Sequence, residues 1–167
     1  MQKRHFGQTM PLLAPLRIAP DNPLIPSVLE LVQREFAYME ARINPQSSMH
    51  RMTTHDIEKQ CVTGEVWVVG ERPDACVFFT EKTDCFYLGK LAVASEQRGK
   101  GYARQLIRLA EQRARAKGFS TLELETRIEL VENHKTFQRL GFKKIKEGAH
   151  SGFLEPTYIV MQKAILP

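Results

Sequence analysis

The sequence predicts a single α+β domain with three layers, in which a mixed, mostly antiparallel central sheet carries helices on both faces. A short strand and two helical segments come first, and three strands joined by short turns follow them, which is the pattern of an antiparallel meander. A strand, a helix and a further strand come next, in the order of a parallel crossover. One more helix and two strands complete the order, and the chain contains no internal repeat.

The first elements are a short strand and two helices. Leu16 to Ala19 is expected to start the sheet. After Pro26 and Ser27, a helix is predicted from residues at helical spacing, which are Val28, Leu31, Val32, Glu35, Phe36 and Met39. Residues 43–52 read as a loop. A short helix then begins at Thr53 or Thr54 with Asp56 in its first turn, because a hydroxyl followed by an acid caps a helix start.

The meander consists of residues 65–70, 74–81 and 85–94, which are rich in β-branched and aromatic residues. The turn residues Arg72, Pro73 and Asp74 separate the first two strands. These three segments should therefore pair in sequence order.

The crossover helix follows the meander. Its apolar face consists of Ala103, Leu106, Ile107, Ala110 and Ala114, and Gly118 ends it. Residues 120–126 alternate Leu122 and Leu124 with acids, as a half-buried strand does. A last helix over Val131–Leu140 ends at Gly141, before strands at 142–148 and 156–164.

Length and composition fit one soluble domain. The chain has 167 residues, 43% of them hydrophobic and 26% charged, so neither disorder nor a fibrous protein is indicated. We assign residues 1–15 to a loose, proline-rich lead-in and residues 16–167 to the domain. The net charge is +5, but the cations are interleaved with acids along the chain, which argues against a nucleic-acid partner.

The cysteines and the hydropathy pattern indicate a cytoplasmic protein. The three cysteines, Cys61, Cys76 and Cys85, form no CxxC pair and lie far from any histidine at zinc-site spacing, so we expect buried free thiols in a reducing compartment and no metal. No run of apolar residues is long enough to span a membrane, so no membrane partner is expected.

The start of the crossover helix is unusual, because Arg98, Gly99, Lys100 and Gly101 precede it and no acid follows until Glu111. A helix start carries unpaired N–H donors and a partial positive charge, so it normally attracts acids or an anion. Cations and glycines at this place predict a loop that binds phosphate.

Two common phosphate-binding motifs match this loop only in part. In a Walker loop the second glycine would fall on Arg104, counted from Gly99, or on Leu106, counted from Gly101, so that motif does not fit. A dinucleotide fingerprint begins at Gly99 and Gly101 but ends on Arg104 instead of glycine. The dinucleotide-binding interpretation stays open, because Glu123 or Glu125 follows at about the distance along the chain where an acid would bind the ribose. A plain glycine turn without a ligand also stays open.

A third loop type fits better. Arg98, Gly101 and Ala103 resemble the [RQ]-x-x-G-x-[GA] signature of the GNAT superfamily of N-acetyltransferases. The preceding LGKLAVASE resembles that superfamily's fourth strand, and FQRLGF, at 137–142, resembles its late helix-to-strand turn. The resemblance implies acetyl-CoA as cofactor, a primary amine of a small molecule or protein as acceptor, direct transfer in a ternary complex, and a splayed V between the fourth and fifth strands.

The resemblance also implies the residues that bind coenzyme A. The backbone of Arg98, Gly99, Gly101, Tyr102 and Ala103 would hold the pyrophosphate, with Lys100 or Arg104 on the 3′-phosphate. The strand residues Leu91, Ala92 and Val93 would pair with pantetheine, and Asn133 would contact its arm. Two positions depart from the pattern, because Phe137 replaces the usual proton-donating tyrosine and Leu130 replaces a common asparagine.

The catalytic and acceptor residues are less defined by sequence. Glu125 and Tyr87 are the candidates for the base that deprotonates the amine. On the acceptor side the candidates are Glu40, Arg42, Asn44, Ser47 and Ser48, and a pairing of Glu40 with Arg42 would suit a substrate that carries both an amine and a carboxylate. The alternative function is a module that senses acyl-CoA without turnover, which the missing tyrosine would favour. The sequence leaves open whether the protein forms a homodimer.

Overall fold

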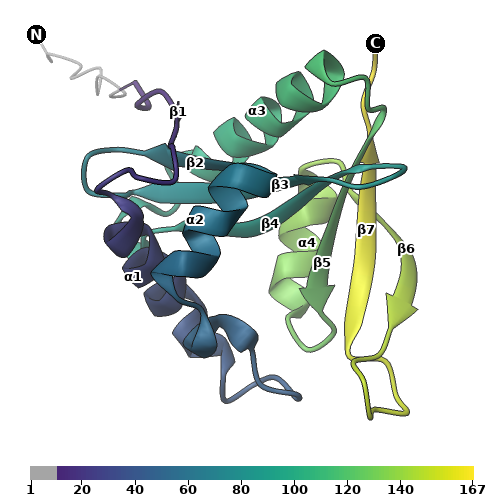
Figure 1. The fold of residues 1–167 in the computed structure, drawn as a ribbon. Helices are drawn as coiled ribbons and strands as arrows, with labels where there is room; N and C mark the ends of the chain where they lie inside the picture. The colour runs from purple at the N-terminus through teal and green to yellow at the C-terminus, as the bar shows by residue number, and fades with distance from the viewer. Residues whose placement is uncertain (1–10) are drawn as a thin grey trace, which may run out of the picture.

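The computed structural model describes residues 11–167, and it contains one seven-stranded sheet in the order β1-β2-β3-β4-β5-β7-β6 (Figure 1). The strands are β1 (Leu16–Arg17), β2 (Glu65–Val69), β3 (Ala75–Glu81), β4 (Phe86–Val93), β5 (Thr121–Arg127), β6 (Lys143–Gly148) and β7 (Tyr158–Ala164). The helices are α1 (Ile25–Phe36), α2 (Thr54–Thr63), α3 (Tyr102–Ala116) and α4 (Val131–Arg139), with short 3₁₀ turns η1 (Ala37–Met39), η2 (Ser48–Arg51) and η3 (Ser95–Gln97). This order confirms the predicted α+β class.

Most predicted elements form at the expected positions. The N-cap of α2 is Thr53, and its side chain and that of Asp56 form a reciprocal capping box, in agreement with the predicted helix start. The first strand is shorter than predicted, because only Leu16 and Arg17 pair with β2. The predicted first helix also stops early, since Met39 lies in η1. Residues 1–10 of the predicted lead-in lie outside the described residues.

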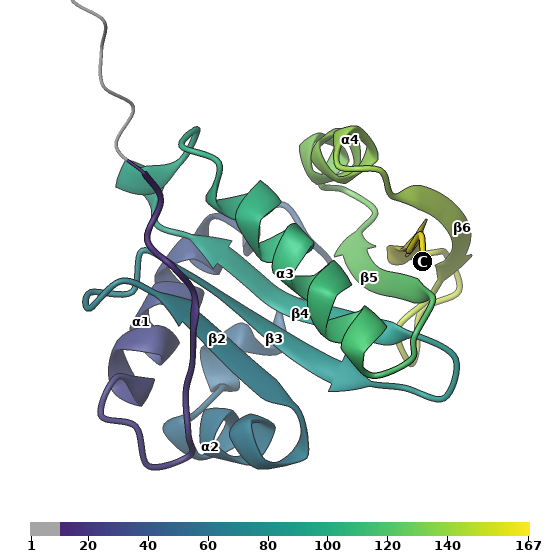
Figure 2. The same ribbon diagram turned by 90° about the horizontal axis from the view of Figure 1, so that it is seen from above.

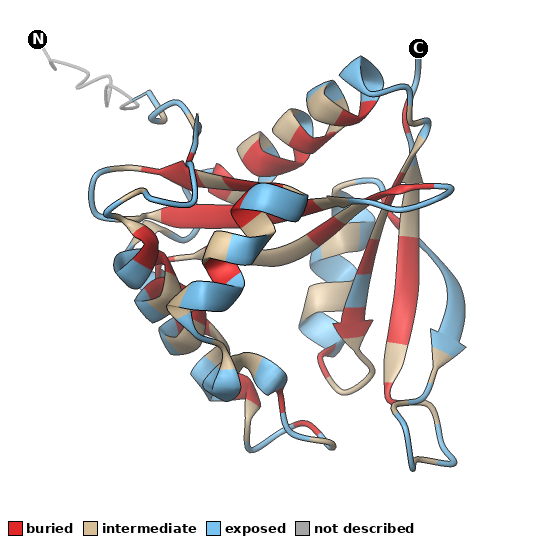
Figure 3. Cartoon of the chain, viewed as in Figure 1, coloured by how far each residue is buried: buried red, intermediate tan, exposed pale blue. Residues whose placement is uncertain are grey.

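Helices cover both faces of the sheet, and each face has its own core (Figure 2). On one face, Leu106, Ile107 and Ala110 of α3 pack on β2 to β5 and β7. On the other face, α1 and α2 contribute Val28, Val32 and Ile57, among others, to a second core. Figure 3 shows buried residues on the strands and on the helix sides that face them, whereas β6 is almost entirely exposed at the sheet edge.

The strands β4 and β5 are parallel but touch only briefly. Their register comprises the two pairs Phe86–Leu122 and Tyr87–Glu123, and beyond these pairs the strands diverge (Figure 1). A β-bulge lies in the diverging part of β4, because Cys76 pairs with Ala92 but Phe78 pairs with Gly89. The extra residue on β4 leaves Lys90 with a φ of +49°. The V that the resemblance implied is therefore present.

The cysteines are buried and free, as predicted. Burial raises the pKa of the Cys76 thiol to about 12, so it stays protonated and unreactive at neutral pH. Within the part of the chain that the structure describes, no helix is both long enough and apolar enough to cross a membrane.

Candidate active site

The predicted phosphate loop joins η3 to α3 and has the geometry of an anion cradle. Gly99 and Gly101 have φ values of +78° and +98°, a backbone conformation that glycine adopts without strain. Gly101 is the N-cap of α3, whose start has no side-chain cap and no acid in its first turn. The first N–H groups of a 15-residue helix therefore remain available to an anion.

A buried carboxylate on the other side of the sheet fixes this loop. Glu35, near the end of α1, is 6% exposed. Its carboxylate accepts hydrogen bonds from the Ser95 N–H at 3.2 Å and from the Ser95 hydroxyl at 3.1 and 3.2 Å. It also accepts one from Arg98 Nη2 at 2.9 Å. The helix α1 thus holds both the start and the first cation of the loop.

Two cavities meet at this loop. The larger, about 800 Å³, lies where β4 and β5 diverge and reaches η1, η2 and α4. The smaller, about 360 Å³, lies over the loop, and both are lined by Val93, Arg98 and Ala103. A combined space of this size fits an extended ligand that has one end at the loop and the other inside the V.

Most of the predicted donor residues line these cavities. The larger cavity is lined by Leu91, Ala92, Val93, Arg98, Ala103, Asn133 and Phe137. The smaller one is lined by Val93, Arg98, Gly99, Gly101, Tyr102, Ala103 and Arg104. Lys100 lines neither cavity, and its ammonium group donates a hydrogen bond to Gln97 at 2.8 Å.

Both candidate bases, Tyr87 and Glu125, line the larger cavity. Burial, reinforced by the nearby carboxylates of Glu125 and Glu123, raises the pKa of the Tyr87 phenol far above its ordinary value. Tyr87 therefore stays neutral and is not suited to be a base. Glu125 on β5 is exposed, lines the larger cavity and forms no ion pair with another described residue.

Side-chain contacts hold α4 to the chain that precedes it and to the chain that follows it. Phe137 packs edge-on against Phe142, with ring centroids 5.9 Å apart. Asn133 lies inside the helix, whose N-cap is Leu130, so an N-cap role does not explain Asn133. His134 Nε2 lies 2.9 Å from the Arg127 carbonyl oxygen and donates to it, since a carbonyl only accepts.

The acceptor-side candidates separate into two groups. Ser47 and Ser48 line the larger cavity, and the Ser47 hydroxyl also accepts from the Met49 N–H at 3.1 Å. Glu40, Arg42 and Asn44 do not line it. The Arg42 guanidinium is paired with Glu132 at the start of α4, and this pairing lowers the pKa of Glu132 to about 2. The structure therefore does not bring Glu40 and Arg42 to the cavity, and their role in acceptor binding stays a prediction.

Among the lining residues of the larger cavity that sequence reasoning missed are Glu35, Lys90, Arg127 and His150. One signal was present for Glu35, because a carboxylate occurs among the apolar residues at helical spacing in α1. Lys90 gave no signal, since its position follows from the bulge. His150 reaches the cavity from the connection between β6 and β7, where its ring packs edge-on against Tyr158.

The fold and the site together define a class of protein, the transferases that bind an acyl-CoA between two splayed strands. The family model described as the acetyltransferase (GNAT) family matches residues 26–142. The chain belongs to this family and is an acetyl-CoA-dependent N-acetyltransferase. The resemblance drawn from the loop, the strand and the late turn is thereby confirmed, together with acetyl-CoA as the cofactor.

Solved structures show the same fold at low sequence identity. An acetyltransferase of the GNAT family from Staphylococcus aureus has a TM-score of 0.71 at 14% identity, covering 92% of this chain and 100% of that one. An acetyltransferase from Streptococcus agalactiae has a TM-score of 0.69 at 19% identity, covering 90% and 97%. An aminoglycoside 6′-N-acetyltransferase complexed with coenzyme A has a TM-score of 0.71 at 14% identity, covering 93% and 98%. The comparison with curated proteins gives no match.

Proposed function

We propose that this enzyme transfers the acetyl group to a primary amine by direct attack, in a complex that holds donor and acceptor together. Acetyl-CoA supplies a thioester, whose carbonyl carbon takes the amine and whose sulfur leaves as a thiol. The observation that carries the proposal is the uncapped, acid-free start of α3, which opens into the cavity between β4 and β5.

The donor is held by backbone. The N–H groups at the start of α3 and the glycines before it take the pyrophosphate, while Arg98 and Arg104 supply charge. Beyond Tyr87, β4 has no strand paired on its β5 side among the described residues, so its backbone is free to pair with the pantetheine arm as an added strand would. The N–H groups near Leu91 and Val93 also suit the thioester oxygen, where a hydrogen bond strengthens as negative charge develops.

Protons are handled by few groups. An ammonium must lose a proton before it attacks, and Glu125 is the group that we assign to this step, directly or through water. Tyr87 stays neutral because its pKa is raised, and it orients the reactants by donating from its hydroxyl. Phe137 has no proton to give, so the departing sulfur takes its proton from water.

Replacement of Gly101 by Val tests the donor site. A branched side chain at φ +98° blocks the close approach of phosphate to the loop, so we expect acetyl-CoA affinity to fall at least 100-fold by calorimetry. Gly118→Val is the matched control, since Gly118 has φ +82° at the other end of α3 with nothing within 4 Å of an added Cβ. The control reproduces the backbone strain and should leave affinity unchanged. A folded Gly101→Val protein with normal affinity contradicts the assignment.

Turnover separates an enzyme from a sensor. We expect the protein to release coenzyme A thiol in the presence of amines, and the Glu125→Gln variant to release it at least 100-fold more slowly with acetyl-CoA affinity retained. The absence of the usual tyrosine favours the second candidate, a non-catalytic acyl-CoA sensor. Binding of acetyl-CoA without acetylation of any amine in a broad panel, followed by a gain of activity on Phe137→Tyr, would support that second candidate.

A further inference from the structure

Lys90 occupies an unusual position in the wall of the larger cavity. It lies in the bulge of β4, next to the backbone that we assign to the donor, and it is the single non-glycine residue with positive φ among residues 11–167. A lysine rarely adopts this conformation, and backbone strain of this kind clusters at functional sites. The bulge therefore marks the Lys90 side chain as a candidate for a role in the cavity.

The ammonium group of Lys90 has no partner among the described residues. Among residues 11–167, the lysines that form ion pairs do not include Lys90; they are Lys82, Lys117, Lys144 and Lys163. Burial lowers the pKa of Lys90, and no described carboxylate lies near enough to oppose the shift. A half-buried cation in the wall of a cavity, without a counter-ion among the described residues, is complementary to an anionic group of a ligand.

A second cation reaches the same cavity from the opposite strand. Arg127 on β5 lines it, and Arg127 Nη2 donates to the Gln46 carbonyl oxygen at 3.3 Å. Arg127 Nη1 is buried without a hydrogen-bond partner among the described residues. Burial lowers the pKa of Arg127 as well, although the nearby carboxylates of Glu129 and Glu40 oppose this shift. The two residues that carry these cations thus line the cavity from β4 and from β5, one on each side of the V.

The carboxylates of the cavity do not neutralise these cations. Glu35 is engaged by Ser95 and Arg98, and Glu132 by Arg42. Glu125 is left as the acid without an ion pair among the described residues that line the cavity, and we have assigned it to the amine. Among the residues that line the cavity, Glu125 is therefore free for an ammonium, and Lys90 and Arg127 are the cations without an ion pair. The carboxylates of Glu129 and Glu40 lie near Arg127 but do not line the cavity.

We propose that Lys90, with Arg127, binds a carboxylate of the acceptor, so that the acceptor belongs to the class of amino-carboxylic acids. The inference rests on the proposed function, because it places the acceptor amine at Glu125. It moves the recognition of a carboxylate from Arg42, which is already paired, to cations that line the cavity. The bulge thereby serves two purposes, since it frees backbone for the donor and turns Lys90 toward the acceptor.

The first test compares acceptors that differ only in the carboxylate. The probes are tyrosine and tyramine, histidine and histamine, arginine and agmatine, and lysine and cadaverine, with thiol release as the readout. We expect Lys90→Met to lower kcat/KM for the amino acids about 10- to 100-fold and to change it less than threefold for the decarboxylated amines. Acetyl-CoA affinity should not change. The control is Lys143→Met on the exposed strand β6, which should leave all values unchanged.

The second test does not depend on turnover. Dilute acetic anhydride acetylates accessible neutral amines, and peptide mass spectrometry reports the rate at Lys90 with acetyl-CoA bound. We expect the amino acids to slow this labelling at least fivefold and the decarboxylated amines to leave it unchanged. Equal labelling with both sets overturns the carboxylate site, whether or not any probe is acetylated.

The two tests also separate this inference from the proposed function. Acetylation of the decarboxylated amines alone leaves the N-acetyl transfer intact and overturns the role of Lys90. Protection of Lys90 by amino acids without any acetylation confirms the carboxylate site and overturns the proposed transfer.

Discussion

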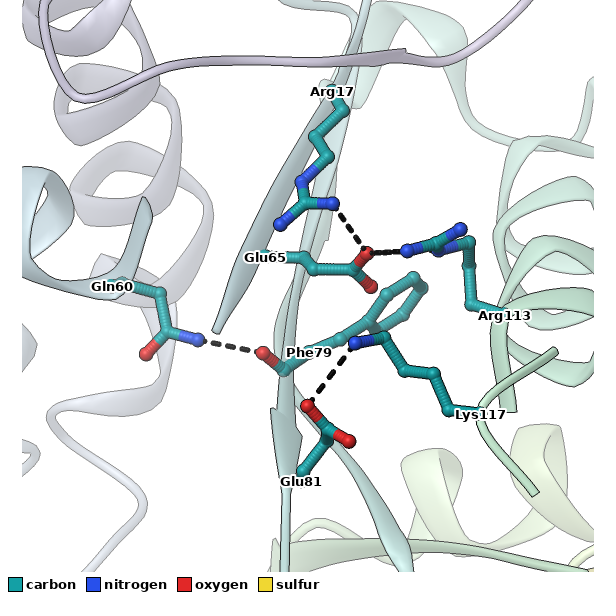
Figure 4. Close-up of polar contacts among 7 residues, drawn as sticks. All are labelled: Arg17, Gln60, Glu65, Phe79, Glu81, Arg113 and Lys117. Atoms are coloured by element: carbon teal, nitrogen blue, oxygen red, sulfur yellow. Dashed lines mark hydrogen bonds and ion pairs between the residues drawn. The ribbon is translucent and has the colours of Figure 1, made fainter. Parts of the chain in front are cut away.

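Two buried glutamates, Glu35 and Glu65, each bind an arginine on opposite faces of the sheet, yet they serve different ends. Glu35 binds Ser95 and Arg98 of the phosphate loop. Glu65, at the start of β2, binds Arg17 of β1 and Arg113 of α3 (Figure 4). By the strand register, these contacts lie at the far end of the sheet from that loop. A buried glutamate–arginine pair therefore does not by itself indicate a functional site.

The difference lies in what remains free on the arginine. The Arg98 side chain is 56% exposed and lines both cavities, so it has donors left for a ligand after it has bound Glu35. The Arg113 side chain is 28% exposed, lines neither cavity and lies over the Trp67 ring. The first pair presents a cation, whereas the second joins β1, β2 and α3.

Replacement of Glu65 by Ala should have the largest effect on stability. It leaves two arginines without their counter-ion, and breaking a buried pair in this way typically costs about 3–5 kcal/mol. Because Arg17 and Arg113 are partly exposed, we expect about 2–3 kcal/mol in urea unfolding, with unchanged acetyl-CoA affinity. The control is Glu81→Ala, which breaks the exposed pair with Lys117 in Figure 4 and should cost less than about 1 kcal/mol. A loss of acetyl-CoA binding in a folded Glu65→Ala protein would contradict the conclusion that the Glu65 pair stabilises the fold without contributing to ligand binding.

Replacement of Glu35 by Ala should lower acetyl-CoA affinity and have a smaller effect on stability than Glu65→Ala. Without the carboxylate, Ser95 and Arg98 lose their anchor and the loop must be ordered by the ligand, so we expect acetyl-CoA affinity to fall about tenfold. Stability should fall less than in Glu65→Ala. Glu35→Gln keeps an oxygen for Ser95 and should lose less affinity than Glu35→Ala. Tighter binding by the alanine variant would mean that the negative charge of Glu35 repels phosphate more than its hydrogen bonds position the loop.

Replacement of Phe137 by Tyr should have the smallest effect. Phe137 lines the cavity, as Arg98 does, and its ring packs edge-on against Phe142. A thiol has a pKa of about 8.5, so at pH 7 water protonates the departing sulfur readily. We expect kcat to change less than tenfold in either direction, as measured by steady-state thiol release. A gain of 100-fold or more would show that proton donation from this position limits the wild-type enzyme.

The donor side is predictable from sequence because its function lies in the backbone. Gly99 and Gly101 before an acid-free helix start specify the loop directly, since few other residues adopt its φ angles. The capping box at Thr53 and the alternation of Leu122 and Leu124 define their elements in the same local way. Patterns of this kind depend on neighbours along the chain.

The acceptor side depends on contacts that no local pattern records. Arg42 is an acceptor candidate by sequence, but it pairs with Glu132, which is 90 residues further along the chain. Lys90 lies in the bulge that forms part of the cavity wall because β4 holds an extra residue opposite β3, and that mismatch is visible only once the two strands are in register. Tyr87 is a candidate base by sequence, but the burial that keeps it neutral follows from tertiary packing.

The two register pairs that join β4 to β5 also set the order in which the chain can fold. The strands β2, β3 and β4 pair through short turns. By contrast, β4 can pair with β5 only after the phosphate loop and α3, which lie between them in the chain, have packed on the sheet. Parallel pairing across a long connection forms late, because it gains few contacts until the crossover is in place. The cleft between these strands is therefore expected to be among the last parts of the molecule to form, and the first to open when it unfolds.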